Sequence, residues 1–433
     1  MNRSFHGKAG RRAVGGVLLA LAMLGQLQAG ESHHAAHAEE GAIGASVEEL
    51  LAVARAMNPE LAAMALEAEA AAARVEGSDA LPDPRLQVTV EDIVKNSSGW
   101  PGRPSGAKFV VQQEFPLWGK RALKRQVAEA DHHKAQGELA AWMAELLGKV
   151  KTVYAEYHQV HLAMEQNEEL IGILRTLVRV AQARYAQGAA WQNEVTAAEL
   201  ERSGLTAERV RLSNERKRLK ARLNALLNRA PDAPIVEQPR LRTIPAASTL
   251  DFGQLMARLL EANPQLAKGR ASLTAAQGNR ELASREWFPD VGVGVGLVKR
   301  QDEADSFEAM VEMGIPLQWE ARRAREKEAV AMEQASHARL EAERTRLASE
   351  LQEALLALES ARGVEQITHN SLLPQARMAL QSALRNYENG GGDSLQVLDA
   401  VQRLKKYRIE QIKAQYEQQM RLADVERLMG GEW

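Results

Sequence analysis

The stretch from Tyr387 to Ala400 contains two aspartates, Asp393 and Asp399, near the start of a predicted helix. Three consecutive glycines interrupt a helical pattern there, and Asp393 and Ser394 are natural N-caps for the helix that resumes. Asp399 follows within the first two turns. If several copies of its carboxylate met at one constriction, they would repel one another and attract cations. The simpler interpretation is a solvated carboxylate that the helix dipole favours near a helix N-terminus.

Three histidines near the N-terminus, His33, His34 and His37, have a spacing compatible with a metal-binding tail. They are equally compatible with a polar N-terminal segment, or with one that is removed on export. The chain contains no nucleophile elbow, phosphate-binding loop or metalloprotease motif. We therefore expect a protein that is not an enzyme and uses no cofactor, and we assign no catalytic or metal-ligating residue.

Residues 1–29 have the features of a secretory signal peptide, with residue 38 as an alternative end. Four basic side chains precede an apolar run, from Ala13 to about Leu24, that is too short to span a bilayer. The absence of cysteine excludes a lipid anchor on an N-terminal cysteine and any disulfide. No later segment predicts a transmembrane helix, so a membrane crossing would have to use strands.

Composition indicates long helices. Aromatic residues make up only 4% of the chain and charged residues 26%, with abundant alanine, glutamate, arginine, glutamine and leucine. The formal net charge of −2 gives no reason to expect a nucleic-acid partner.

The chain contains an internal repeat. Four landmarks occur twice in the same order, roughly 200 residues apart, a period much longer than that of solenoid proteins. They are Asn-Pro-x-Leu (58–61 and 263–266), Pro-Leu (116–117 and 316–317), the Tyr-x-x-Gly tips (185–188 and 387–390) and the ends of the last helices (226–228 and 428–430). A tandem duplication with two pseudo-symmetric halves explains this order.

Each half follows the same predicted plan of helix, β-hairpin and long helical hairpin. The first repeat, residues 46–228, places its hairpin at 85–116 and a proline-free helix of about 67 residues from Gly119 to Tyr185, roughly 100 Å long. The proline-rich segment 229–248 is the linker between the halves. The second repeat, residues 249–430, places its hairpin at 290–317, and Pro374 should bend or restart its long helix.

The four predicted strands each have one apolar and one polar face. A four-stranded sheet in lipid would leave both edges unpaired, so closure requires strands from other copies. Polar residues on the inward face favour a larger, wet barrel over a filled one; they are Gln87, Thr89, Glu91, Gln112, Glu114, Glu308 and Glu312. The alternative is two surface hairpins on a soluble helical protein.

After the signal peptide, the chain resembles the TolC-type outer-membrane efflux proteins. The resemblance rests on the duplicated Asn-Pro-x-Leu motif, on Phe-Pro-Leu-Trp-Gly-Lys-Arg (115–121), and on the Tyr-x-x-Gly tips, the second followed by Val-Leu-Asp-Ala. It implies a mainly α-helical fold of two tandem repeats. Three chains would form a homotrimer with a 12-stranded β-barrel in the outer membrane and coiled helices across the periplasm.

The resemblance also implies a function. The chain would be the passive exit duct of a tripartite efflux system, with a periplasmic adaptor (membrane fusion) protein and an inner-membrane RND-type pump as partners. The 115–121 segment is most similar to the heavy-metal efflux branch of the family.

Carried over position by position, the resemblance implies adaptor-docking tips at Gly188, Gly390 and the adjacent Gly391. It also implies a periplasmic gate, whose residues are Asp399, Glu194, Tyr387 and Gln396. Two departures concern this gate. Gly392 stands where the family has a gate-locking arginine, and Gln396 stands where it has a second aspartate. A closed state with fewer charge-assisted bonds should open more readily.

Other functions remain compatible with the sequence. The same duct could serve multidrug efflux or type I protein secretion. A periplasmic adaptor would need a lipoyl-like β domain between its helical arms, whereas this chain has two short hairpins, each between helices. A structural coiled-coil protein is the third alternative.

Overall fold

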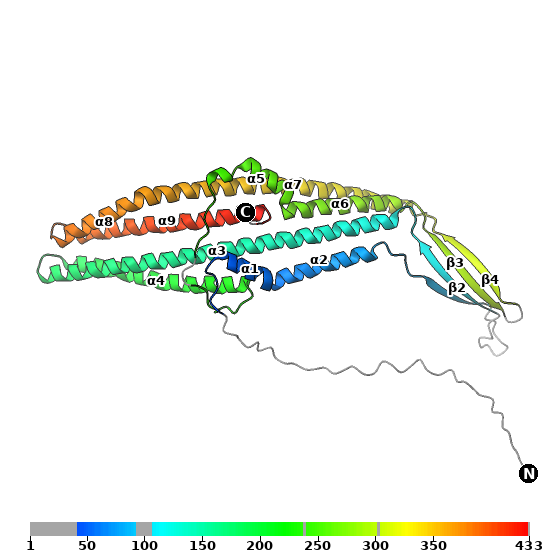
Figure 1. Cartoon of the computed structure of the whole chain (residues 1–433), viewed down its shortest axis with the longest axis horizontal. Coiled ribbons are helices and arrows are strands. Elements are labelled where there is room, and N and C mark those ends of the chain that lie inside the picture. Colours follow the sequence, from blue (N-terminus) through cyan, green and yellow to red (C-terminus); the bar gives the residue numbers. More distant parts are fainter. Residues whose placement is uncertain (1–40, 92–105, 237–239, 301–303, 432–433) are drawn as a thin grey trace, which may run out of the picture. The chain divides into compact units, whose positions relative to one another are not determined.

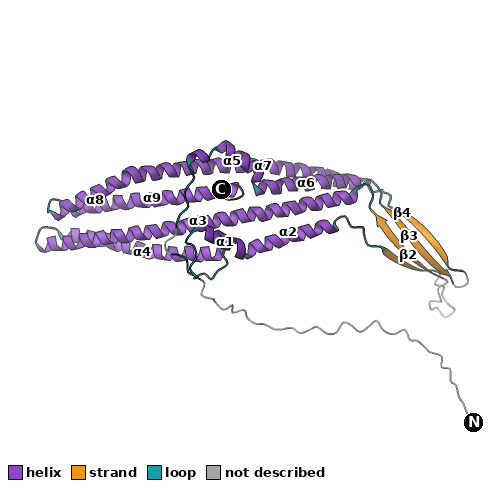
Figure 2. Cartoon of the chain, in the orientation of Figure 1, coloured by secondary structure: helices purple, strands orange, loops and turns teal. Residues whose placement is uncertain are grey.

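The computed structural model describes residues 41–91, 106–236, 240–300 and 304–431. The predicted signal peptide and the three N-terminal histidines lie outside these ranges. The rest is mainly α-helical with one small antiparallel sheet, as expected (Figures 1 and 2). No helix in the described ranges is both long and apolar enough to cross a membrane.

The first repeat contains α1 (Val47–Met57), α2 (Pro59–Gly77), β1 (Arg85–Glu91), β2 (Gly106–Phe115), α3 (Lys120–Ala186) and α4 (Gln192–Leu226). The second contains α5 (Phe252–Ala262), α6 (Pro264–Arg285), β3 (Val291–Arg300), β4 (Ser306–Met313), α7 (Trp319–Ile367), α8 (Leu373–Glu388) and α9 (Ser394–Leu428). The α3 helix has 67 residues, because no proline interrupts it.

The opening helix of each repeat is divided in two, whereas the sequence pattern predicted a single helix. The break falls at Asn58 and at Asn263, which have extended backbones and are followed by proline. The side-chain oxygen of each asparagine accepts hydrogen bonds from the next two free backbone N–H groups, at 2.9–3.1 Å. Its amide nitrogen donates to the last helix of the same repeat, at Leu226 O (3.0 Å) and Leu428 O (2.8 Å). The Asn-Pro motif therefore caps one helix and ties it to another.

The long helix of the second repeat is interrupted just before Pro374. A π-helical segment, Thr368–Leu372, separates α7 from α8, and Pro374 is the second residue of α8. Since proline cannot donate the hydrogen bond that an unbroken α-helix needs there, the ladder is rearranged in the preceding turn. The equivalent part of α3 contains Gly172 and is continuous.

Three apolar clusters hold the helices together. One lies where α3, α4, α8 and α9 pack near the helical hairpin tips, and includes Leu174, Leu380 and Tyr387. The other two lie around α1 and α5, where the shorter helices meet α3 and α7. Figure 1 shows α3 beside α4 and α9, consistent with its packing against these helices and α6.

The strands form one sheet in the order β1-β2-β3-β4, every pair antiparallel. The two hairpins are joined through β2 and β3, with Phe109 opposite Leu297 and Val111 opposite Val295. Each repeat therefore contributes two neighbouring strands.

Candidate functional site

Both helical hairpin tips turn in the same way. Gly188 and Gly390 adopt φ angles of 72° and 84°, which favour glycine. In each tip a backbone N–H bonds back to the helix that ends there, Ala189 N to Arg184 O (2.8 Å) and Gly391 N to Asn386 O (3.0 Å). A side chain at either glycine would meet nothing within 4 Å. The backbone angle, not a lack of space, therefore favours glycine at these two positions. Both tips are exposed, and so is Gly391.

Two of the predicted gate residues contact each other. The Tyr387 hydroxyl, at the end of α8, donates to Glu194 Oε2 near the start of α4 at 3.2 Å. The Tyr387 side chain is buried, with 1% of its surface exposed. Burial and then the Glu194 carboxylate raise the pKa of Tyr387 to about 12. The phenol therefore remains a hydrogen-bond donor at physiological pH.

Arg184, in the last turn of α3, completes this group. Its guanidinium lies 4.5 Å from the centre of the Tyr387 ring, and its Nη1 donates to the Tyr387 carbonyl at 2.8 Å. We call Arg184, Glu194 and Tyr387 the tip clamp. The clamp joins α3 and α4 of the first repeat to α8 of the second, so separating the two hairpins would break it.

Sequence reasoning missed Arg184. It predicted a weaker gate because Gly392 occupies the position of an arginine in the family. In the structure, Arg184 Nη1 lies 3.5 Å from the Gly392 carbonyl, and Nη2 lies 3.3 Å from the Ala189 carbonyl. An arginine thus reaches the same loop from another helix. The sequence feature that could have identified Arg184 is its position in the last turn of α3, because cationic side chains there commonly bond the carbonyls at the helix end.

The other two predicted gate residues are not part of the clamp. Asp399 is exposed and forms an ion pair with Arg403, one turn further along α9, at 2.9 Å. Gln396 is also exposed on α9. Within the described part of one chain, the structure therefore brings together Tyr387 and Glu194 but leaves Asp399 and Gln396 exposed and apart from them.

The sheet has two chemically distinct faces, as predicted. The apolar face is exposed over all four strands; for example, Leu86 is 66% exposed, Val295 65% and Phe307 89%. The opposite face carries the predicted polar residues Gln87, Thr89, Glu91, Gln112, Glu114, Glu308 and Glu312. An isolated water-soluble sheet would not leave such a continuous apolar face uncovered.

Glycines in β3 let side chains of β2 and β4 meet across it. Gly292, Gly294 and Gly296 occupy the polar face of β3, so no side chain stands between its neighbours. Lys108 on β2 forms an ion pair with Glu308 on β4 at 2.6 Å. Gln112 likewise donates a hydrogen bond to Glu312. These contacts link the two repeats and partly neutralise the polar face.

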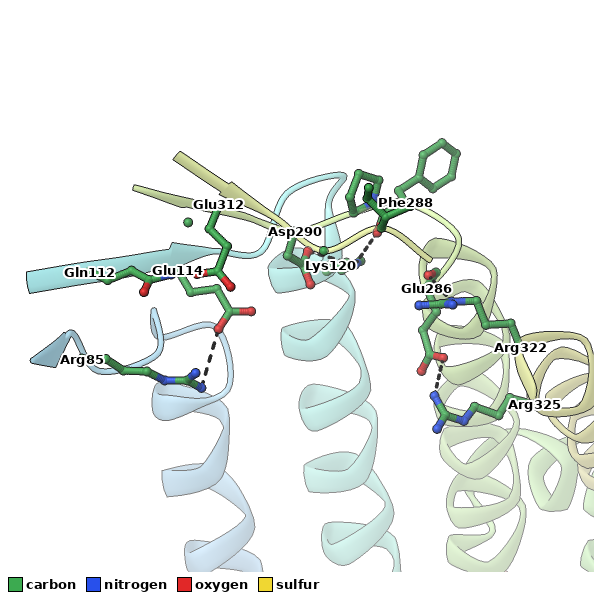
Figure 3. A pocket seen from close by; sticks show the side chains of 14 residues that line it. Arg85, Gln112, Glu114, Lys120, Glu286, Phe288, Asp290, Glu312, Arg322 and Arg325 are labelled. Carbon is green, nitrogen blue, oxygen red and sulfur yellow. Dashed lines mark hydrogen bonds and ion pairs between the residues drawn. The ribbon is translucent and has the colours of Figure 1, made fainter. Parts of the chain in front are cut away.

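A polar cavity of about 500 Å³ lies where the sheet meets the helices (Figure 3). Two ion pairs lie in its wall, with Lys120 Nζ 2.9 Å from Asp290 and Arg325 2.9 Å from Glu286. The motif at 115–121 builds this junction, because Trp118 and Lys120 also donate to the carbonyls of Pro289 (2.7 Å) and Phe288 (2.9 Å). The motif therefore anchors the first repeat to the second.

Comparisons with known proteins agree with this architecture. The family model described as outer membrane efflux protein matches residues 50–229 and 255–431, one segment in each repeat. The cobalt-zinc-cadmium resistance protein CzcC of Cupriavidus metallidurans is 27% identical over 390 residues, covering 89% of this chain and 90% of that protein. The nickel-cobalt-cadmium resistance protein NccC of Alcaligenes xylosoxydans xylosoxydans is 25% identical over 256 residues, covering 57% of this chain and 55% of that protein.

Among solved structures, the outer-membrane channel OprN superposes with a TM-score of 0.79 at 18% identity, covering 89% of this chain and 90% of that chain. That likeness confirms the TolC-type fold. The family match covers most of the sequence, and these proteins are channels and resistance proteins, not enzymes. The chain belongs to the outer membrane efflux protein family and is an efflux channel of the outer membrane.

Proposed function

We propose that this chain is the passive exit duct of a tripartite system that expels heavy-metal cations. Three copies would assemble as a homotrimer. An inner-membrane RND-type pump would supply the energy, and a periplasmic adaptor would join the pump to the tips. The duct itself would perform no chemistry.

The observation that carries the proposal is the open sheet. Its two outer strands have unpaired edges within the described residues, while its apolar face is exposed. Unpaired backbone groups are costly in lipid, so such a sheet is stable there only when other strands close it. Three copies supply 12 strands, enough for a barrel with a wet interior lined by the polar face.

The tip clamp supports a closed resting state. Its contacts join the two helical hairpins of one chain, so an iris-like separation of these hairpins would open the duct. The adaptor would bind the exposed turns at Gly188, Gly390 and Gly391 and favour the separated arrangement. Three copies of exposed Asp399 would form an acidic ring that attracts cations, with Gln396 beside it.

The names of two relatives support the choice of substrate. CzcC and NccC are described as resistance proteins for cobalt, cadmium and zinc or nickel. The acidic residues of the polar face and Asp399 suit a path for cations. Specific coordination is not required of a duct, because the pump would select the substrate.

Survival of a deletion strain tests the proposal. We expect the strain to lose resistance to Co²⁺, Zn²⁺ and Cd²⁺, and to regain it with the intact gene. Hydrophobic toxins and the secretion of large proteins serve as parallel measurements. Unchanged metal resistance together with a new sensitivity to hydrophobic toxins would refute the metal assignment and favour multidrug efflux. Loss of a secreted protein alone would favour type I secretion.

A further inference from the structure

The open edges of β1 and β4 contain enough information to predict how two copies pair. The β1 strand has 7 residues and β4 has 8. The inner edge of each is paired with β2 or β3, and the outer edge is unpaired within the described residues. This inference rests on the proposed trimer and adds the pairing register that the trimer would use.

The two repeats match residue by residue in the sheet. Pro82-Asp83, before β1, matches Pro289-Asp290 before β3, while Pro116-Leu117, after β2, matches Pro316-Leu317 after β4. These matches make Leu86 equivalent to Val293 and Val111 equivalent to Val311. Leu86 pairs with Val111 in the first hairpin, and Val293 pairs with Val311 in the second. The sequence matches and the observed ladders therefore agree without any shift.

The ladder between the repeats can be transferred by the same equivalence. The β2–β3 ladder places Gln113 opposite Val293 and Val111 opposite Val295. We propose that β4 pairs antiparallel with β1 of a second copy in the equivalent register. Met313 then lies opposite Leu86 of that copy, and Val311 lies opposite its Val88.

The register fits the chemistry of both faces. It places apolar residues opposite apolar residues on the exposed face, and Glu312 opposite Gln87 on the polar face. Glu308 would lie opposite Glu91 of the second copy. Each of these two carboxylates already has a cation in its own chain, with Glu308 2.6 Å from Lys108 and Glu91 3.9 Å from Arg300.

Repeat symmetry distinguishes this register from slips of two residues, whereas the two faces of the strands already exclude slips of one. A slip of one residue would turn the apolar residues of one strand to the polar face. A slip of two residues would preserve both faces, so the alternation of side chains cannot exclude it. The slip places Leu86 opposite Val311, or Val88 opposite Met313.

Disulfide trapping tests the register, and the absence of cysteine from the chain makes every introduced thiol unique. Directly opposed residues have Cα atoms about 4.5–5.5 Å apart, within disulfide range. A slip of two residues displaces the two Cα atoms from each other by about 7 Å along the strand. The distance between them then exceeds the limit of about 7 Å for a disulfide, so no bridge forms. Adjacent pairs alternate between close and wide spacing, so two pairs are needed: Leu86→Cys with Met313→Cys, and Gln87→Cys with Glu312→Cys.

Full-length variants are oxidised with copper phenanthroline in isolated outer membranes. Covalent species are then separated by size on denaturing gels without reductant. We expect at least one of the two pairs to give covalent dimers and trimers at about tenfold the yield of the slip controls. The controls are Leu86→Cys with Val311→Cys, and Val88→Cys with Met313→Cys. Each single-cysteine variant should give no covalent species.

The outcomes separate this register from the proposed function. Preferential bridging of a slip control, with trimers still formed, would overturn the register and leave the exit duct intact. If no pair bridges and the folded chain is monomeric in detergent by light scattering, the trimer fails and the register fails with it. If trimers form but neither pair nor control bridges, the register is also overturned.

Discussion

Removing one hydroxyl from the tip clamp should make the duct open more readily. Tyr387→Phe keeps the buried ring and the contact with Arg184, but it removes the hydrogen bond to Glu194. A hydrogen bond to a charged group contributes about 1.5–3 kcal/mol. Because Glu194 is only half-buried, a water molecule can replace part of the lost hydrogen bond. We therefore expect the substitution to destabilise the closed state by about 1 kcal/mol per chain. If the clamps of three chains open together, the free-energy difference between the closed and open states changes by about 3 kcal/mol, a shift of roughly a hundredfold toward the open state.

Single-channel recording in planar bilayers measures this shift. The matched control is Tyr185→Phe, because Tyr185 is the equivalent residue of the first repeat and is 49% exposed. We expect a higher open fraction for Tyr387→Phe and wild-type behaviour for the control. Equal open fractions for the two variants would refute the role of the clamp.

A double-mutant cycle distinguishes loss of the hydrogen bond from a general loosening of the tip. Glu194→Gln alone should open the duct to a similar extent as Tyr387→Phe, because it removes the charge that strengthens the same bond. Since both substitutions act on one interaction, their combination should add little to either alone. Additive effects would show that the two residues act independently.

Four further predictions concern other parts of the chain. Asp399→Ala should reduce cation preference and block by multivalent cations in bilayers, whereas Glu417→Ala, which removes another exposed ion pair of α9, should not. Asn263→Ala removes a helix cap and a buried bond between helices, so it should cost about 2 kcal/mol and lower the thermal midpoint measured by circular dichroism. Gly296→Val should reduce the yield of assembled protein on non-denaturing gels, because a Cβ there would lie 3.1 Å from a side-chain carbon of β2. The raised pKa of Tyr387 contributes stability that is fully present below pH 10 and is lost as the pH rises toward about 12. Subtracting the phenolate absorbance of Tyr387→Phe from that of the wild type isolates this residue, and the difference should titrate in the same pH range.

The elements with a strong local pattern could be predicted from sequence. Alternating residues such as Leu86, Val88 and Val90 define the faces of a strand without reference to the rest of the fold. The absence of proline likewise predicts the unbroken α3 helix. Duplicated landmarks predict the two repeats because both copies need the same turn or cap, as Asn58 and Asn263 show.

Contacts between the repeats could not be predicted in this way. Tyr185 and Tyr387 occupy equivalent positions, yet only Tyr387 is buried, because the two hairpins pack asymmetrically. Arg184 has no distinctive sequence context, and its partners come from a segment about 200 residues away. Such contacts depend on how distant helices are brought together, which local propensity does not specify.

The glycine strand has a consequence for the inside of an assembled trimer. Its counterpart β1 carries Arg85, Gln87 and Thr89 where β3 has Gly292, Gly294 and Gly296. Equivalent strands around the wall would thus differ in what covers them. The β3 strand is spanned by side chains of its neighbours, Lys108 with Glu308 and Gln112 with Glu312, whereas β1 carries side chains of its own. An ion passing β3 would meet an ion pair and a hydrogen-bonded pair, whereas an ion passing β1 would meet guanidinium and amide groups.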